Sequence, residues 1–142
     1  MSEIEKAKEI VEDFISAMNS WEKNAEIIDN NQENGLTWQQ KAILIKEEVT
    51  SIIDKYCTEK QRKMSAPNSI RRGLEGTYVY DPAIEKVETV EREKNNRLLV
   101  YTTKQEEKEY FCYVLLKKDA QWIIDSKKRK FYGEEKWQNS YL

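Results

Sequence analysis

The side chains best suited to chemistry are one carboxylate and three aromatic residues in the second half of the chain. Asp125 closely follows Trp122, and Tyr101 and Tyr113 fall in neighbouring segments with the composition of β-strands. In a curved-sheet pocket, desolvation raises the pKa of a carboxylate, and a tyrosine hydroxyl can donate to a developing oxyanion. One hypothesis is therefore a pocket of the lyase or isomerase type. The plainer interpretation is that Asp125 begins a turn and the tyrosines are half-buried sheet residues.

Most other catalytic groups are missing from the sequence. It has no histidine, which excludes a histidine general base, a Ser-His-Asp triad, a Cys-His pair and every histidine-containing zinc site. Cys57 and Cys112 are too few for a cysteine-only zinc site, and four scattered glycines form no phosphate-binding loop. We therefore expect no catalytic residues, no metal and no cofactor, in a protein that acts by binding another molecule.

The most prominent charged feature is a set of carboxylates in the predicted sheet region. The set consists of Glu85, Glu88, Glu91, Glu93, Glu106 and Glu107. A solvated strand face is one interpretation of this set, and a docking surface for a basic protein is the other. Because side chains alternate between the two faces of a strand, the sequence does not show which of these carboxylates lie together. The net charge of −2 is too small to identify the partner.

Two amphipathic helices and an antiparallel sheet are expected to position these residues. Apolar residues at steps of three and four predict helices over 3–29 and 37–62, each with a capping-box pattern at its start. From residue 84 the period changes to two, which predicts at least four antiparallel strands up to residue 125. Trp137 and Tyr141 share a helical face, so the segment 127–142 fits a closing helix or a packed tail. The prediction is a single α+β domain over 1–142, with a strongly curved sheet around the helices.

The tryptophans and cysteines are expected to be structural. Trp21 and Trp38 lie on the apolar stripes of the two helices, and Trp122 lies in an alternating strand. All three are predicted to be largely buried, because large aromatic side chains contribute much of a core of this size. Cys57 and Cys112 are predicted to be reduced thiols, since two cysteines in a chain of 142 residues make no disulfide framework.

No feature of the sequence points to a membrane, to secretion or to a nucleic acid. The first residues lead directly into a charged amphipathic helix, and no apolar run approaches the roughly 18 residues of a membrane span. The basic segment 127–130 is four residues long, which fits a charged chain end better than a nucleic-acid contact. We therefore expect a cytoplasmic protein with neither a membrane nor a nucleic acid as its partner.

Three local patterns, taken in order, resemble a known family. They are MNSWE at residues 18–22, KYCTEKQR at 55–62 and WIIDS at 122–126. Together they are similar to the immunity proteins of bacterial polymorphic toxin systems that adopt the nuclear transport factor 2-like fold, and the resemblance covers nearly the whole chain.

This resemblance implies both a fold and a function. The fold is a cone of the cystatin-like type, in which long N-terminal helices pack into a strongly bent antiparallel sheet. The function is to bind and neutralise a cognate toxin, without catalytic residues. The sequence does not decide whether the protein forms a homodimer through the face of the sheet. The alternative is a small-molecule-binding protein or a lyase/isomerase-type enzyme of the same fold, with a carboxylate and tyrosine pocket.

Overall fold

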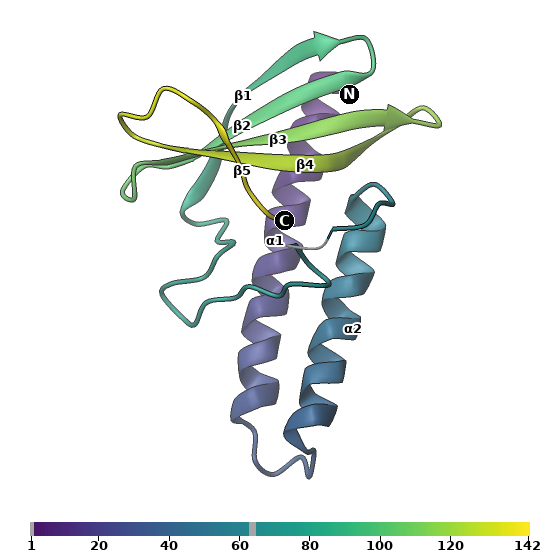
Figure 1. The fold of residues 1–142 in the computed structure, drawn as a ribbon, viewed down its shortest axis with the longest axis vertical. Helices are drawn as coiled ribbons and strands as arrows, with labels where there is room; N and C mark the ends of the chain where they lie inside the picture. Colours follow the sequence, from purple (N-terminus) through teal and green to yellow (C-terminus); the bar gives the residue numbers. More distant parts are fainter. Residues whose placement is uncertain (1, 63–64) are drawn as a thin grey trace.

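The computed structural model describes residues 2–62 and 65–142. Its elements are α1 (Glu3–Asn30), α2 (Trp38–Tyr56), β1 (Glu85–Lys94), β2 (Arg97–Lys104), β3 (Glu109–Lys118), β4 (Gln121–Phe131) and β5 (Gln138–Asn139). Each strand pairs antiparallel with the next along the chain, so the sheet order is β1-β2-β3-β4-β5 (Figure 1). The predicted α+β class, with two helices before an antiparallel sheet, is confirmed.

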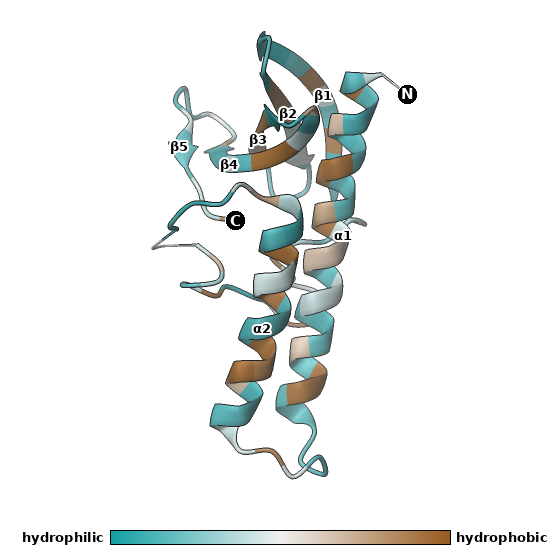
Figure 2. Cartoon of the chain, turned by 90° about the vertical axis from the view of Figure 1, so that its right-hand side faces the viewer, coloured by the Kyte–Doolittle hydropathy of each residue, from teal (hydrophilic) through white to brown (hydrophobic). Residues whose placement is uncertain are grey.

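The core lies between α1 and the inner face of the sheet. Val11, Phe14 and Met18 recur on one face of α1 and are buried. The Phe14 ring meets those of Tyr80 and Tyr113 edge to face, with centroids 5.5 and 6.4 Å apart. The sheet covers the N-terminal half of α1. The C-terminal half of α1 packs against α2 and extends beyond the sheet (Figures 1 and 2). The apolar stripe on α1 therefore serves two different partners along its length.

The start of α2 is as predicted, but its end is not. Thr37 and Gln40 form a complete capping box, in which each side chain accepts from the other residue's backbone N–H. The helix then ends at Tyr56, six residues before the predicted end at Arg62. The cause is competition from the sheet: Cys57 is extended and forms a bridge with Ile124, and the Thr58 N–H donates to the Ile124 carbonyl at 2.8 Å.

One of the three tryptophan predictions is wrong. Trp21 and Trp122 are buried, but Trp38 is 75% exposed. Trp38 is the first residue of α2, and the start of α2 lies at the end of the helical hairpin, away from the sheet (Figure 2). The helical period assigns Trp38 to the apolar stripe of α2, but it does not reveal that this end of the hairpin extends beyond the elements that would cover the stripe.

Three bulges shape the sheet and determine which side chains point inward. The register of β1 on β2 shifts between Val87 and Thr89 and again between Arg92 and Lys94, and that of β3 on β4 shifts between Val114 and Leu115. A bulge adds one residue to one strand, bends that strand and changes the phase of its alternation. Between the two bulges of β1, and beyond the bulge of β4, each side chain therefore lies on the face opposite to that given by simple alternation.

The C-terminal segment is strand and loop, not the closing helix that was one of two expectations. β4 continues six residues beyond the predicted end at Asp125, because β3 is long enough to pair with it as far as Phe131. The chain then turns back, and β5 pairs with residues 128–129 of β4. This return brings Trp137 against the outer face of the sheet, where its ring centroid lies 5.8 Å from that of Tyr101.

Both cysteines are buried free thiols. Burial raises the pKa of Cys57 to about 12 and that of Cys112 to about 11, and the thiolate is the reactive form. We expect both thiols to react with a disulfide reagent in denatured protein without reductant, and far more slowly in the folded protein. A denatured protein with no reactive thiol would contradict this prediction.

Candidate functional site

A groove on the outer face of the sheet unites three of the residues singled out from the sequence. Its volume is about 280 Å³, and its lining includes Glu88, Glu91, Tyr101, Tyr110, Lys130 and Trp137. They share a face because Thr89 pairs with Tyr101 across β1 and β2, while Tyr110 pairs with Lys130 across β3 and β4. Glu88 is the extra residue of the first β1 bulge, which leaves both Glu88 and Glu91 exposed.

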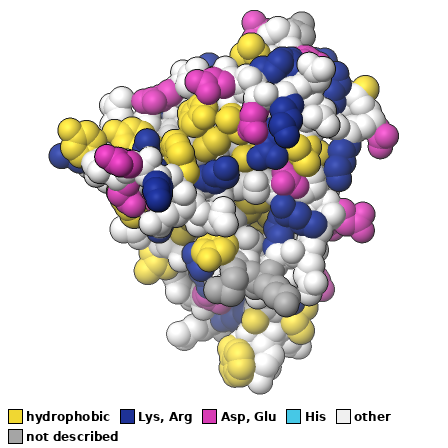
Figure 3. Space-filling model, turned by 45° about the horizontal axis from the view of Figure 1, so that its top comes forward, with side chains coloured by type: hydrophobic (Ala, Val, Ile, Leu, Met, Phe, Trp, Pro, Cys, Tyr) yellow, Lys and Arg dark blue, Asp and Glu magenta, His cyan; other side chains and the backbone are white. Residues whose placement is uncertain are grey.

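The groove combines aromatic walls with carboxylates. Tyr101 and Trp137 are inclined at 48°, and the Lys130 ammonium lies 4.9 Å from the centroid of Trp137. Burial, together with the nearby Glu91 charge, raises the pKa of Tyr101 to about 12, so its hydroxyl is a neutral donor near pH 7. Neither Glu88 nor Glu91 forms an ion pair with a described residue. Figure 3 shows hydrophobic side chains gathered over the sheet end of the molecule, with charges of both signs among them.

Glu85 lies apart from the exposed carboxylates. It is buried on the inner face, where Oε2 accepts from the Thr102 hydroxyl at 2.6 Å and from the Tyr113 hydroxyl at 2.8 Å. In this conformation Glu85 is therefore not available to a partner, contrary to its inclusion in the predicted docking surface.

The remaining predicted carboxylates lie at opposite ends of the sheet. Glu93, near the β1–β2 turn, pairs with Arg97 at 3.1 Å. Glu106 and Glu107 occupy the β2–β3 turn at the other end, and Glu107 lies 4.0 Å from the Lys104 ammonium. The six carboxylates therefore form no continuous acidic surface, and the pair in the groove differs from the rest by its aromatic neighbours.

The four residues of the hypothetical catalytic pocket do not meet. Tyr101 faces the outer groove, whereas Tyr113 is in the core on the inner side. Trp122 lines a different groove, of about 490 Å³, together with Tyr56 and the first half of α1. Asp125 lies in a polar cluster at the end of α2. The two tyrosines are separated because β2 and β3 present Tyr101 and Tyr113 to opposite faces of the sheet.

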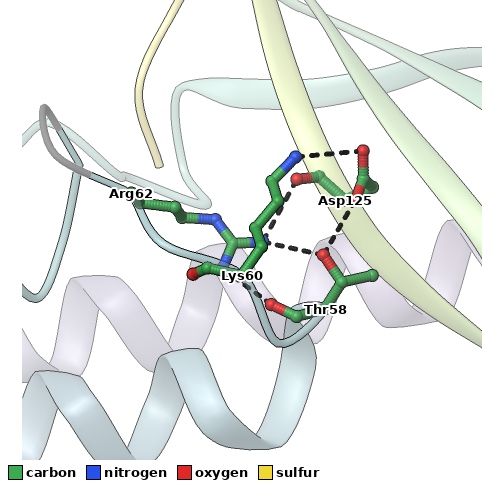
Figure 4. Close-up of polar contacts among 4 residues, drawn as sticks. All are labelled: Thr58, Lys60, Arg62 and Asp125. Carbon is green, nitrogen blue, oxygen red and sulfur yellow. Dashed lines mark hydrogen bonds and ion pairs between the residues drawn. The ribbon is translucent and has the colours of Figure 1, made fainter.

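The cluster around Asp125 fastens the end of α2 to β4 (Figure 4). Asp125 accepts from the Thr58 hydroxyl at 2.8 Å and from Lys60 Nζ at 3.2 Å. Arg62 donates to the Thr58 carbonyl at 2.7 Å and to the Asp125 carbonyl at 3.2 Å. Partial burial works against the charged carboxylate, but the Thr58 and Lys60 hydrogen bonds outweigh it and lower the pKa of Asp125. An ionised carboxylate with both oxygens engaged is suited to a structural role rather than to proton transfer.

The burial of two charged residues, Glu22 and Lys127, was not predicted from the sequence. Glu22 on α1 is fully buried and accepts backbone N–H bonds from Gly73 at 3.0 Å, Val79 at 2.9 Å and Tyr80 at 3.0 Å. Its place on the apolar stripe, four residues after Met18, was a signal that could have revealed it. Lys127 faces inward because Asp125 is the extra residue of the β4 bulge, and no sequence signal marks that bulge.

The described residues contain no group of three or more potential metal ligands. None of the described helices has the length and apolar character needed to cross a membrane.

Comparisons with known proteins indicate the family. Residues 6–141 match the profile of a family described as NTF2 fold immunity protein. The chain is 33% identical over 137 residues to a protein named Immunity protein RhsIA from Dickeya dadantii (strain 3937), and the alignment covers 96% of each chain. No solved structure shows a significant match.

Proposed function

The chain belongs to the NTF2 fold immunity protein family, and we infer that it neutralises a cognate bacterial toxin by binding it, without a catalytic step. The resemblance seen in the sequence motifs is thereby confirmed, as is the immunity role that it implies. The binding mechanism is supported by the separation of the four residues proposed for an enzymatic pocket. The proposed partner is therefore a protein, the cognate toxin domain, and the proposed place of binding is the cytoplasm.

We place the toxin contact at the outer-face groove. The observation that carries this choice is the pair of exposed carboxylates, Glu88 and Glu91, which form no ion pair within 2–62 and 65–142 and lie beside Tyr101 and Trp137. Such a groove suits a lysine or arginine side chain, because the cation gains both a carboxylate and the face of an aromatic ring. A basic protrusion on the toxin is therefore the complementary surface.

The groove residues should differ in what they contribute. Exposed charges mainly change the association rate and its salt dependence, whereas a partly buried aromatic anchor mainly changes the dissociation rate. Glu88 and Glu91 are exposed, and Trp137 is half-buried against Tyr101. The carboxylates should thus steer the toxin, and Trp137 should hold it.

We expect the double variant Glu88→Lys/Glu91→Lys to slow association with the toxin by about tenfold and to flatten its salt dependence, because charge steering contributes factors of this size. Trp137→Ala should instead speed dissociation by roughly tenfold or more, as for the loss of an aromatic hot spot. Surface plasmon resonance with the toxin encoded beside this protein, at several salt concentrations, measures both rates.

The matched control is Glu12→Lys/Glu47→Lys, which changes the net charge equally but at exposed positions on the two helices. Equal slowing by the control would mean that net charge, not the groove, is responsible, and the proposed surface would then be wrong.

The immunity role itself is tested by co-expression of this protein with the toxin. It fails if the wild-type protein gives no protection and no complex forms at micromolar concentration. The mass of the free protein, from light scattering, tests the homodimer that would cover the same sheet face.

A further inference from the structure

A second cavity lies on the opposite, inner side of the sheet. Its volume is about 350 Å³, and it is bounded by the ends of β2, β3 and β4, the segment 77–80 and residues 140–142. Four cationic side chains line it, together with two acidic ones; they are Arg71, Lys104, Lys127, Arg129, Glu107 and Glu109. The cavity is therefore positive on balance, unlike the outer groove.

Lys127 is the innermost of these cations and is only 4% exposed. No hydrogen bond or ion pair joins its ammonium group to a described residue. Its neighbours are aromatic rings: Nζ lies 4.3 Å from the centroid of Phe111, 4.5 Å from that of Tyr80 and 5.3 Å from that of Tyr113. Burial lowers the pKa of Lys127 to about 8, which the nearby Glu85 charge partly opposes. The three ammonium donors of this largely buried side chain thus have no acceptor among the described residues, an arrangement that proteins generally avoid.

The side chain of Tyr80 lines the same cavity, but its hydroxyl is enclosed in the core. The side chain is 1% exposed, and its hydroxyl has no hydrogen-bond partner among the described residues. Its backbone is firmly placed, since its carbonyl accepts from Asn19 Nδ2 at 2.7 Å and its N–H donates to Glu22 at 3.0 Å. The hydroxyl is therefore held in position by the fold and not by a contact of its own.

Two of the other charged groups around the cavity, Lys104 and Arg71, already have partners. Lys104 donates to the Val79 carbonyl at 2.8 Å and faces Glu107 at 4.0 Å. The guanidinium of Arg71 lies 4.3 Å from the centroid of Tyr141. Glu85 directs one oxygen to hydroxyl groups and forms no ion pair with Lys127. Glu85 Oε1 and the Tyr80 hydroxyl also lack a hydrogen-bond partner among the described residues, but both atoms are enclosed, so the Lys127 ammonium is the unpartnered group that a ligand in the cavity can reach.

We propose that this cavity binds a small organic carboxylate, whose oxygens accept from Lys127 Nζ while its body packs against Phe111 and Tyr141. A carboxylate provides several acceptor sites at once and neutralises the buried ammonium, which water does only in part. The cavity is large enough for a molecule of the size of benzoate, and its walls are partly aromatic. This binding site is separate from the toxin-binding groove and does not depend on it.

The test uses benzoate as the probe and benzamide as its uncharged counterpart. Both are titrated into the full-length protein at millimolar concentration and followed by 1H–15N NMR. Benzoate should shift backbone signals in residues 77–80 and 127–129, and benzamide should bind at least about tenfold more weakly, since it lacks the charge. Lys127→Met should reduce benzoate affinity by about tenfold or more, because it removes the charged donor.

The matched control is Lys128→Met, the same change on the adjacent residue of β4, which points to the outer face. It should leave benzoate binding unchanged. The comparison of benzoate with benzamide uses the wild-type protein, so it decides the question if Lys127→Met does not fold. The proposal is overturned if benzoate leaves the wild-type spectrum unchanged, if benzamide binds equally well, or if Lys127→Met binds benzoate like the wild type.

Discussion

Glu22→Ala is expected to lower the free energy of unfolding by about 3–5 kcal/mol, since it leaves three backbone N–H groups without their acceptor and opens a cavity beside the core. Those groups belong to Gly73, Val79 and Tyr80, in a segment without regular secondary structure. The Glu22 carboxylate thus takes the place of a strand partner for this segment. Urea denaturation followed by circular dichroism measures the change.

The control for this prediction is Glu12→Ala, at an exposed position on the same helix, which should change the stability by less than about 0.5 kcal/mol. Burial raises the pKa of Glu22 above 4.5, although the three N–H bonds oppose that shift. The folded protein therefore holds the Glu22 proton more tightly than the unfolded chain, and the stability from Glu22 decreases as the pH rises from about 4.5 towards the raised pKa. The cost of Glu22→Ala should be largest below this window. An equal, small cost for both variants would contradict the anchoring role.

Trp21→Ala is expected to cost about 3–5 kcal/mol of stability, as for other buried tryptophans. Trp21 is 1% exposed, and its indole N–H donates to the Ile45 carbonyl at 2.9 Å, which joins α1 to α2. The truncation therefore removes both packing and a contact between the helices. Guanidinium chloride denaturation gives the difference in free energy.

Trp38→Ala is the matched control, because it removes the same side chain from an exposed position. Its expected effect is below about 0.5 kcal/mol. A loss of less than about 1 kcal/mol for Trp21→Ala, or an equal loss for both variants, would show that the apolar stripe on α1 is not the core.

Helical periodicity predicted the part of the fold that depends on local pattern. The stripe through Val11, Phe14 and Met18 set the length of α1 to within a residue of Asn30, and the capping box at Thr37 placed the start of α2. The end of α2 could not be predicted in this way. Residues 57–62 leave the helix because β4 offers Cys57 and Thr58 better partners, and that strand is more than sixty residues away in the sequence.

The site was harder to predict than the fold. Glu88, Glu91 and Tyr101 were each singled out, and the structure brings them together. Trp137 was noticed but assigned to a possible helix, because the return of the chain into β5 has no local signal. Lys127 was missed altogether: simple alternation from Trp122 and Ile124 places it outward, and only the bulge at Asp125 turns it inward.

That bulge also bears on how the protein can change through evolution. Deleting Asp125 would remove only the extra residue and leave Lys127 opposite Tyr113 on the inner face, but deleting a later residue of β4 would make the side chains beyond it exchange faces. Insertions and deletions should therefore be confined to turns such as 105–108, which carry no core side chain. Point substitutions in the outer groove meet no such restriction. The lineage can thus follow a changing toxin by exchanging exposed residues one at a time, while the inner face of the same sheet stays constant.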